Sequence, residues 1–232
     1  MYYVKNILKK IYNLRILKNF RNYFRTKKLL GKNYGQINLK TKKGNLLFEF
    51  IKNNNFNSIF EIGTWNGLGS TTTIIEAIKI TNKNVDFYSL ETDKIAYKNA
   101  IKNLNKDKAY VKLLYGRILE IDELPKLSDI DFEFFGYDPK NKEWYFQDIR
   151  RYKKTKNLLN KLPLDFDFIL FDGGEFSTFP EFMKLWHKTK YFALDDVNTY
   201  KQYDVLKFIE KNKKNFELIE EITNFQIYKV TN

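Results

Sequence analysis

The stretch Asn57-Ser-Ile-Phe-Glu-Ile-Gly-Thr-Trp-Asn-Gly-Leu-Gly-Ser-Thr71 decides the fold. It opens on an apolar run of strand type over residues 59–62, passes through a loop with three glycines, and enters a helical pattern that runs to residue 80. Glycines let a chain turn sharply and let a ligand lie against bare backbone. Strand, glycine loop and helix in this order predict the first unit of a nucleotide-binding α/β sheet.

A second strand-like run over 85–91 ends in Glu91, about twenty residues after the glycine loop, where such folds place a carboxylate against ribose hydroxyls. The ligand should therefore carry an adenosine-like ribose. A dinucleotide needs a second glycine close behind Gly63, but Thr64 and Trp65 follow instead. The bulky Trp65 argues against a phosphate cradle, whereas S-adenosylmethionine (SAM) has no phosphate.

Glu61, Gly63, Gly67 and Gly69 fit the pattern E-x-G-x-x-x-G-x-[GS], so the loop resembles motif I of class I SAM-dependent methyltransferases. The resemblance covers roughly residues 45–230 and implies SAM as cofactor. The residues that it places at the cofactor are Glu61, Gly63, Thr64, Trp65, Gly67, Gly69, Ser70, Glu91, Arg117 and Asp172. Arg117 follows the third predicted strand, where the family often has an acidic residue beside the adenine.

The rest of the chain alternates strands and helices, which predicts a doubly wound, Rossmann-like sheet. Two alternating segments, 216–222 and 225–230, close the chain as an antiparallel hairpin, which the methyltransferase variant of this fold adds. Residues 119–164 are too long for an ordinary connection. We expect them to hold one helix near 150–161 behind an irregular lid over the acceptor pocket; packing against the sheet edge or a dimer partner is an equal alternative.

Three carboxylates mark the ends of two neighbouring strands. Asp172 ends the fourth predicted strand, and Asp195 and Asp196 end the fifth. Neighbouring strands lie ~4.8 Å apart, and like charges at such spacing repel by ~4 kcal/mol per pair. A metal ion, a basic side chain or a proton must offset this repulsion.

The arrangement resembles that of metal-dependent O-methyltransferases, including those that act on sugars, which implies that Asp172, Asp195 and Asp196 bind Mg²⁺ and the acceptor. Oxygen ligands suit this ion. The alternative is that Asp172 and Asp195 cap helices or bind the SAM amino group while Asp196 pairs with a lysine. Asp172 is the predicted catalytic residue, with Lys201 and Asp148 as further candidates for the base. His187, the only histidine, is expected at the surface or in packing.

The net charge of +13 comes entirely from the N-terminal segment. Residues 1–48 hold 13 Lys and Arg and no acidic residue, while residues 49–232 hold 28 basic and 28 acidic side chains. Apolar residues recur at helical spacing over 2–30, which predicts a basic amphipathic helix. The segment therefore divides the chain into an arm with its linker, residues 1–44, and a methyltransferase domain, residues 45–232.

Such an arm suits an anionic membrane surface, at about 1 kcal/mol for each basic residue near it. Docking on the protein's own domain or on a second subunit of a homodimer is an equal alternative, and nucleic acid is the least favoured. There is no cysteine, no apolar run of the ~18 residues that span a bilayer, and no secretory signal. We therefore expect a cytoplasmic enzyme, peripheral at the inner membrane face if the arm binds lipid.

The sequence thus predicts SAM-dependent methyl transfer to a hydroxyl of a small molecule or of a sugar or surface glycan, with possible help from Mg²⁺. Two alternatives stay open. One is a methyltransferase-like scaffold without activity. The other is a nucleic-acid methyltransferase guided by the basic arm, although the N/D-P-P-Y/F motif of the amino-methyltransferases is absent.

Overall fold

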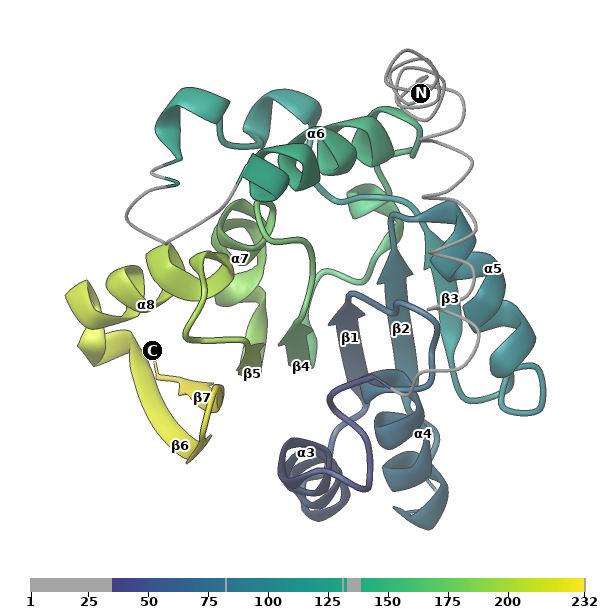
Figure 1. Ribbon diagram of the computed structural model, residues 1–232. Coiled ribbons are helices and arrows are strands. Elements are labelled where there is room, and N and C mark those ends of the chain that lie inside the picture. Colours follow the sequence, from purple (N-terminus) through teal and green to yellow (C-terminus); the bar gives the residue numbers. More distant parts are fainter. Residues whose placement is uncertain (1–34, 82, 131, 133–138, 232) are drawn as a thin grey trace, which may run out of the picture. The chain divides into compact units, whose positions relative to one another are not determined.

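The computed structural model describes residues 35–81, 83–130, 132 and 139–231. They form a seven-stranded sheet in the order β3-β2-β1-β4-β5-β7-β6, with helices packed around it (Figure 1). Five strands are parallel, namely β1 (Ser58–Ile62), β2 (Asp86–Glu91), β3 (Lys112–Tyr115), β4 (Phe166–Phe171) and β5 (Thr189–Asp195). The predicted doubly wound sheet is confirmed.

The C-terminal hairpin is confirmed with the predicted bounds. β6 (Phe216–Ile222) and β7 (Phe225–Val230) pair antiparallel, and β7 lies antiparallel beside β5. Thr223 in the turn has a φ of 43°, the left-handed backbone that a tight hairpin turn requires. β6 is therefore the edge strand of the sheet.

Each face of the sheet has its own apolar core, because successive side chains of a strand point to opposite faces. In β1, Ile59 packs with one set of helices and Phe60 with the other. The first set is α3 (Lys42–Asn53), α4 (Ser70–Thr81) and α5 (Lys94–Asn103), and the second includes α7 (Thr178–Leu185) and α8 (Tyr200–Lys211). Figure 1 shows α3 and α4 on one side of the strands and α7 and α8 on the other.

The strand register brings the predicted site residues to one edge. Ile62, the last residue of β1, pairs with Leu90 of β2 and with Phe171 of β4. Glu91 and Asp172 come one residue later, so both lie at the carboxyl edge, where sheets of this kind bind ligands.

The helix predicted over 150–161 is wrong in its bounds: α6 spans Pro139–Lys153. The helix ends early because the following residues pair with the segment after β3. The Arg117 N–H donates to the Lys156 carbonyl at 3.0 Å, and the Leu158 N–H donates to the Arg117 carbonyl at 2.7 Å. In Figure 1, α6 lies across the side of the sheet toward which the arrowheads of β1 and β2 point.

The predicted amphipathic helix over 2–30 lies outside the described residues. A short helix, α3, begins at Lys42 and precedes β1. Thr41 caps it, because its Oγ1 accepts a hydrogen bond from the Gly44 N–H at 3.1 Å. In the part of the chain that the structure describes, no helix combines the length and apolarity needed to cross a membrane.

Candidate active site

The loop after β1 turns back sharply at Gly63, whose φ is 105°. A Cβ at this position would lie 2.0 Å from the Asp172 carbonyl oxygen, so only glycine fits. Gly67 also has a positive φ, of 79°, and so does Trp65, at 50°. A non-glycine residue in this region is uncommon. The Trp65 N–H donates to Glu91 Oε2 at 2.7 Å, which offers a reason for its conformation.

Glu91 stands at the end of β2 and ties the glycine loop to the next helix. Its Oε2 accepts from Trp65, and its Oε1 accepts from the Asp93 N–H at 2.6 Å. Burial raises its pKa to about 7, against the opposing effect of these backbone hydrogen bonds. The carboxylate is thus fixed in position beside the glycine loop, with lone pairs left for hydroxyl groups of a ligand.

Glu61 lies beneath the loop in a buried polar cluster. Its Oε2 accepts hydrogen bonds from Thr71 Oγ1 at 2.7 Å and from the Ser89 hydroxyl, while Thr64 and Ser89 share a further hydroxyl contact. Burial raises the pKa of Glu61. Its Oε1 has no hydrogen-bond partner among the described residues. Through these hydrogen bonds Glu61 helps to hold the loop in place. A direct contact between Glu61 and a cofactor stays a prediction.

Arg117 has a different environment from the one that the sequence predicts. Its guanidinium donates to the backbone carbonyls of Leu119, Tyr152 and Thr155 and pairs with Glu120 at 3.2 Å. The side chain thus holds the end of α6 against the segment after β3. These structural contacts do not favour its assignment to the cofactor, which no observation tests.

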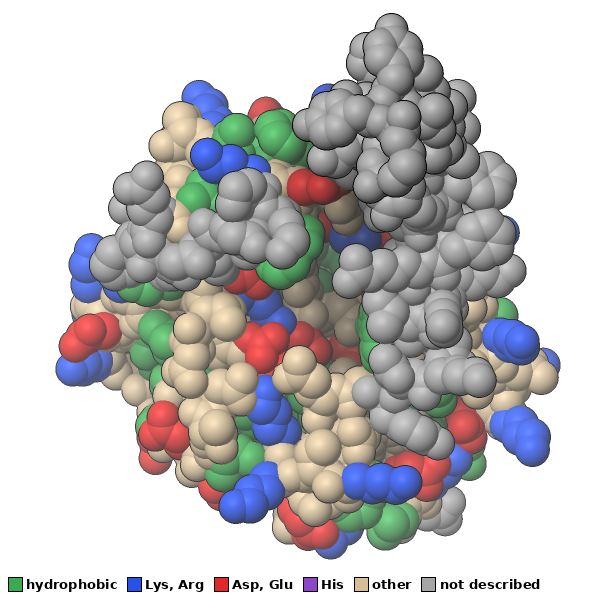
Figure 2. Space-filling view, in the orientation of Figure 1, with side chains coloured by type: hydrophobic (Ala, Val, Ile, Leu, Met, Phe, Trp, Pro, Cys, Tyr) green, Lys and Arg blue, Asp and Glu red, His purple; other side chains and the backbone are tan. Residues whose placement is uncertain are grey.

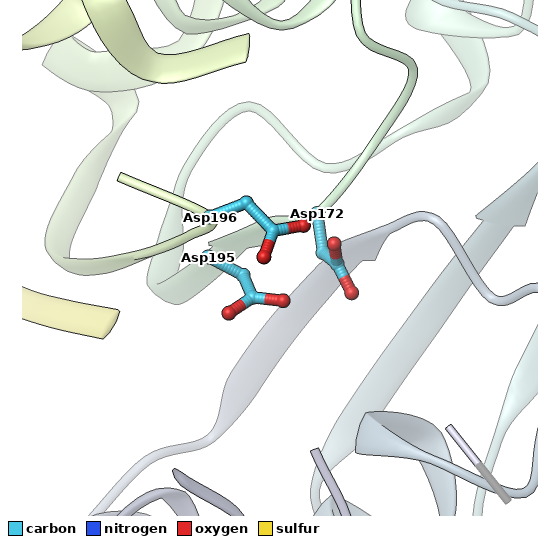
Figure 3. Close-up of side chains that lie close together, drawn as sticks. All are labelled: Asp172, Asp195 and Asp196. Atoms are coloured by element: carbon cyan, nitrogen blue, oxygen red, sulfur yellow. The ribbon is translucent and has the colours of Figure 1, made fainter. Parts of the chain in front are cut away.

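The three predicted carboxylates do come together. One ligand oxygen from each of Asp172, Asp195 and Asp196 lies within 4.8 Å of the other two. Figure 3 shows the side chains converging from the ends of β4 and β5. Asp196 has a φ of 59°, a strained backbone for a non-glycine residue, and Asn224 Nδ2 donates to its Oδ1 at 3.1 Å. The strand-end argument is confirmed for all three.

Two lysines lie on these carboxylates. Lys201 Nζ is 2.6 Å from Asp172 Oδ1 and 3.3 Å from Asp196 Oδ2, and Lys43 Nζ is 2.6 Å from Asp195 Oδ1. In Figure 2, acidic and basic side chains lie next to one another in the hollowed centre of this face. Basic side chains thus offset much of the predicted repulsion.

The titration of the cluster follows from this arrangement. Burial raises the pKa of Asp172 to about 7, even though the Lys201 ammonium favours its ionised form. Burial alone would lower the pKa of Lys201, but Asp172, Asp196 and Asp195 outweigh it and raise that pKa above its ordinary value. These contacts favour the protonated form of Lys201 and so do not favour it as the base, which stays a prediction.

The remaining candidate for the base, Asp148 on α6, is held in an ion pair, because Arg151 Nη1 donates to its Oδ1 at 2.9 Å. His187 is exposed and packs its ring edge-on to Trp186 at 5.8 Å, which confirms its predicted place at the surface. Asp172, which lies next to the glycine loop, remains the candidate that the geometry favours.

Lys43 is the site residue that the sequence did not reveal. It lies at the start of α3, in a segment predicted as linker, and reaches a carboxylate 152 positions later in the chain. The only sign of Lys43 in the sequence was that residues 1–48 contain basic side chains and no acidic ones.

Solved structures share this fold and topology. An O-methyltransferase from Bacillus cereus in complex with SAH is 14% identical with a TM-score of 0.55, over 89% of this chain and 91% of that chain. A putative O-methyltransferase from Klebsiella pneumoniae is 15% identical with a TM-score of 0.56, over 99% and 97%. The O-methyltransferase TomG from Streptomyces achromogenes, involved in tomaymycin synthesis and in complex with SAM, is 14% identical with a TM-score of 0.53, over 84% and 82%.

No protein-family model matches the sequence, and no curated protein matches it. The likeness to solved structures therefore rests on the fold alone. On that basis the chain has the fold of the class I SAM-dependent methyltransferases, with the strand order and reversed seventh strand described above.

Proposed function

We propose that the protein is a SAM-dependent methyltransferase that acts on a hydroxyl group of a small molecule or a sugar. One observation carries the proposal: the glycine loop at Gly63 adjoins the backbone of Asp172 at the carboxyl edge of a sheet with the methyltransferase fold. A cofactor in the loop would thus lie beside a carboxylate that is partly exposed.

For the cofactor, we propose that Glu91 accepts hydrogen bonds from the ribose hydroxyls. The cofactor lies close against the backbone of the glycine loop. Both oxygens of Glu91 are already oriented by backbone N–H groups, so the carboxylate needs no rearrangement to accept from a ribose. The full set of proposed contacts is Glu61, Gly63, Thr64, Trp65, Gly67, Gly69, Ser70, Glu91, Arg117 and Asp172, of which Arg117 has the weakest support.

For the chemistry, the acceptor hydroxyl oxygen attacks the methyl carbon of SAM. The carbon–sulfur bond breaks, S-adenosylhomocysteine (SAH) leaves, and the hydroxyl proton passes to Asp172. Lys201 holds one oxygen of Asp172 at 2.6 Å and so leaves the other oxygen for that proton. Orientation of the two reactants by the enzyme supplies much of the rate, as it does for other bimolecular reactions held in a site.

Mg²⁺ is a further proposal at the same carboxylates. The donors fit this ion in type and spacing, because three carboxylate oxygens lie within 4.8 Å of one another. An ion held by Asp172, Asp195 and Asp196 would lower the pKa of the acceptor hydroxyl. Lys43 and Lys201 compete with it as counter-charges. We therefore expect EDTA to lower turnover several-fold and Mg²⁺ to restore it. Unchanged turnover in EDTA would mean that the two lysines alone neutralise the carboxylates and that no metal is needed.

The test of the function is SAM titration by calorimetry, followed by transfer of label from methyl-labelled SAM to a panel of sugars and small hydroxyl compounds. At saturating SAM, Asp172→Asn should lose at least about a hundredfold in turnover, the usual size of a general-base effect. No binding at millimolar SAM would instead favour the inactive scaffold. Steeply salt-dependent binding of RNA would favour the nucleic-acid alternative.

We also propose that residues 2–30 hold the enzyme at an anionic membrane surface, where its acceptor would be lipid-linked or part of a surface glycan. The support is the sequence pattern of basic and apolar residues alone. A homodimer formed through the same segment is the competing outcome.

A further inference from the structure

A cavity of about 180 Å³ opens beside the carboxylate cluster. It lies between the start of α8 and the segment that leads from β4 into α7, and Lys201 is part of its wall. Lys201 also contacts Asp172, so the cavity and the proposed transfer site share a wall. Pockets for drug-sized ligands measure roughly 300–1,000 Å³. This one therefore suits a single small unit, such as one sugar ring.

The wall of the cavity is acidic. Glu123, Glu175 and Asp204 line it, and among the described residues Lys201 is the one basic side chain in the wall. Glu123 pairs with Lys184 at 2.5 Å, and Lys201 forms ion pairs with Asp172 and Asp196.

Asp204 is the carboxylate left without a counter-charge. It is half-buried, and among the described residues it makes neither an ion pair nor a hydrogen bond. The pKa of Tyr200 rises to about 12, first through burial and then through the nearby charges of Asp204, Asp129 and Glu175.

Aromatic rings form the apolar part of the wall. Phe176, Phe179 and Tyr200 line the cavity, and the Phe176 and Tyr200 rings lie 5.6 Å apart at 45°. Aromatic faces attract a cation within about 6 Å of the ring centre, and desolvation strengthens the attraction. Rings beside a carboxylate without a counter-charge thus favour an ammonium group and disfavour an anion.

From this cavity we infer that the acceptor of the proposed methyl transfer carries a protonated amine next to its hydroxyl groups, as an amino sugar does. The inference rests on the proposed function. Asp204 and the three rings hold the ammonium group, and the hydroxyls face Asp172. A protonated amine has no lone pair with which to attack the SAM methyl group, so the methyl group goes to oxygen. Acceptors with phosphate or carboxylate groups are rejected at this wall.

The test uses the full chain saturated with SAH and three probes that share one sugar ring, namely glucosamine, glucose and glucuronate. Saturation-transfer NMR near pH 6.5 gives their relative affinities. Glucosamine should bind at least tenfold more tightly than glucose, and glucuronate should bind most weakly. Asp204→Asn should remove that tenfold preference, whereas Glu210→Gln, an exposed carboxylate change on the same helix, should keep it.

The inference is overturned if glucuronate or glucose binds as well as glucosamine, or if Asp204→Asn keeps the preference. Absence of binding by all three sugars overturns it as well. A separate titration with SAH tells which proposal fails. Bound SAH without a preference for the amine removes the cavity assignment alone, whereas failure to bind SAH removes the methyltransferase proposal itself. Circular dichroism spectra of both variants should match wild type.

Discussion

At the residue scale, two backbone N–H groups hold the two carboxylate oxygens of Glu91 in position. Replacing one of these oxygens by an amide nitrogen should therefore disturb the side chain. In Glu91→Gln an amide NH₂ would face either the Trp65 or the Asp93 N–H, donor against donor. A buried donor left without a partner costs about 1–3 kcal/mol. We expect the SAM dissociation constant to rise about 10- to 100-fold by calorimetry. Glu49→Gln, an exposed change on α3, is the control, and a shift below twofold for Glu91→Gln would contradict the ribose assignment.

Glu181 predicts a pH dependence of stability. It is buried on α7, accepts from the Tyr152 hydroxyl at 2.6 Å, and has a pKa raised from 4.5 to about 7 by burial. The folded protein therefore binds this proton more tightly than the unfolded chain does. Its contribution to stability is greatest below the unfolded pKa and falls as the pH rises through about 7, by about 3 kcal/mol in all.

Glu181→Gln has no such proton to lose. Relative to wild type, the free energy of unfolding of the variant should therefore rise by up to about 3 kcal/mol between about pH 5 and about pH 8. Urea unfolding at the two pH values measures this difference. Glu217→Gln, on the exposed edge strand β6, should change little at either pH. An equal response of the two variants would mean that Glu181 titrates as an ordinary glutamate.

Some residues of the site follow from the sequence and others do not, for a physical reason. Asp172 and Asp195 end apolar strands, and parallel strands end at a shared edge, so local pattern predicts their meeting. Lys43 meets Asp195 only because α3 packs against the sheet, a contact that no local pattern encodes. Lys201 was visible as a residue near the site, but its protonation state depends on carboxylates from two strands.

At the scale of elements, the sequence predicts the bounds of those with strong periodicity and places α6 too late in the chain. The hairpin of β6 and β7 alternates and turns at a single point, so its bounds were correct. The segment 119–164 has aromatic side chains throughout and lacks a clear stop signal. The end of α6 is instead set by backbone pairing with Arg117, a tertiary contact.

Arg151 connects α6 to the segment between β2 and α5. Its Nε donates to Asp93 Oδ2 at 3.0 Å and its Nη1 to Asp148 Oδ1 at 2.9 Å. Asp93 caps α5 and lies two residues after Glu91, so Arg151 links the predicted lid to the proposed ribose site. Arg151→Ala should speed amide hydrogen exchange in the 142–153 region and weaken SAM binding a few-fold. Arg150→Ala, at the exposed neighbouring position, is the matched control, and equal exchange in the two variants would contradict a fastening role.

At the scale of the whole molecule, the charges divide the chain into two parts with different tasks. The part after residue 48 is formally neutral, so long-range attraction to an anionic surface must come from the preceding segment. Lys43 is already used within the folded body, against Asp195. In the membrane proposal, the basic residues before Gly35, where the compact unit begins, supply the attraction.

This division predicts how the full chain sediments with vesicles that contain phosphatidylserine. Replacing Lys5, Lys9, Lys10 and Lys18 by glutamine removes about 1 kcal/mol of attraction per residue near the surface, and so should lower the bound fraction at least about tenfold. Replacing Lys106, Lys108, Lys211 and Lys214, which are exposed on the body, removes the same charge and should change binding little. Binding of wild type should fall steeply with salt, because surface potentials decay within about 8 Å at physiological ionic strength.

Equal losses in the two variants would show that net charge, rather than the placement of charge in the arm, governs binding. Absence of vesicle binding by wild type, together with a dimer in analytical ultracentrifugation, would assign the arm to a second subunit.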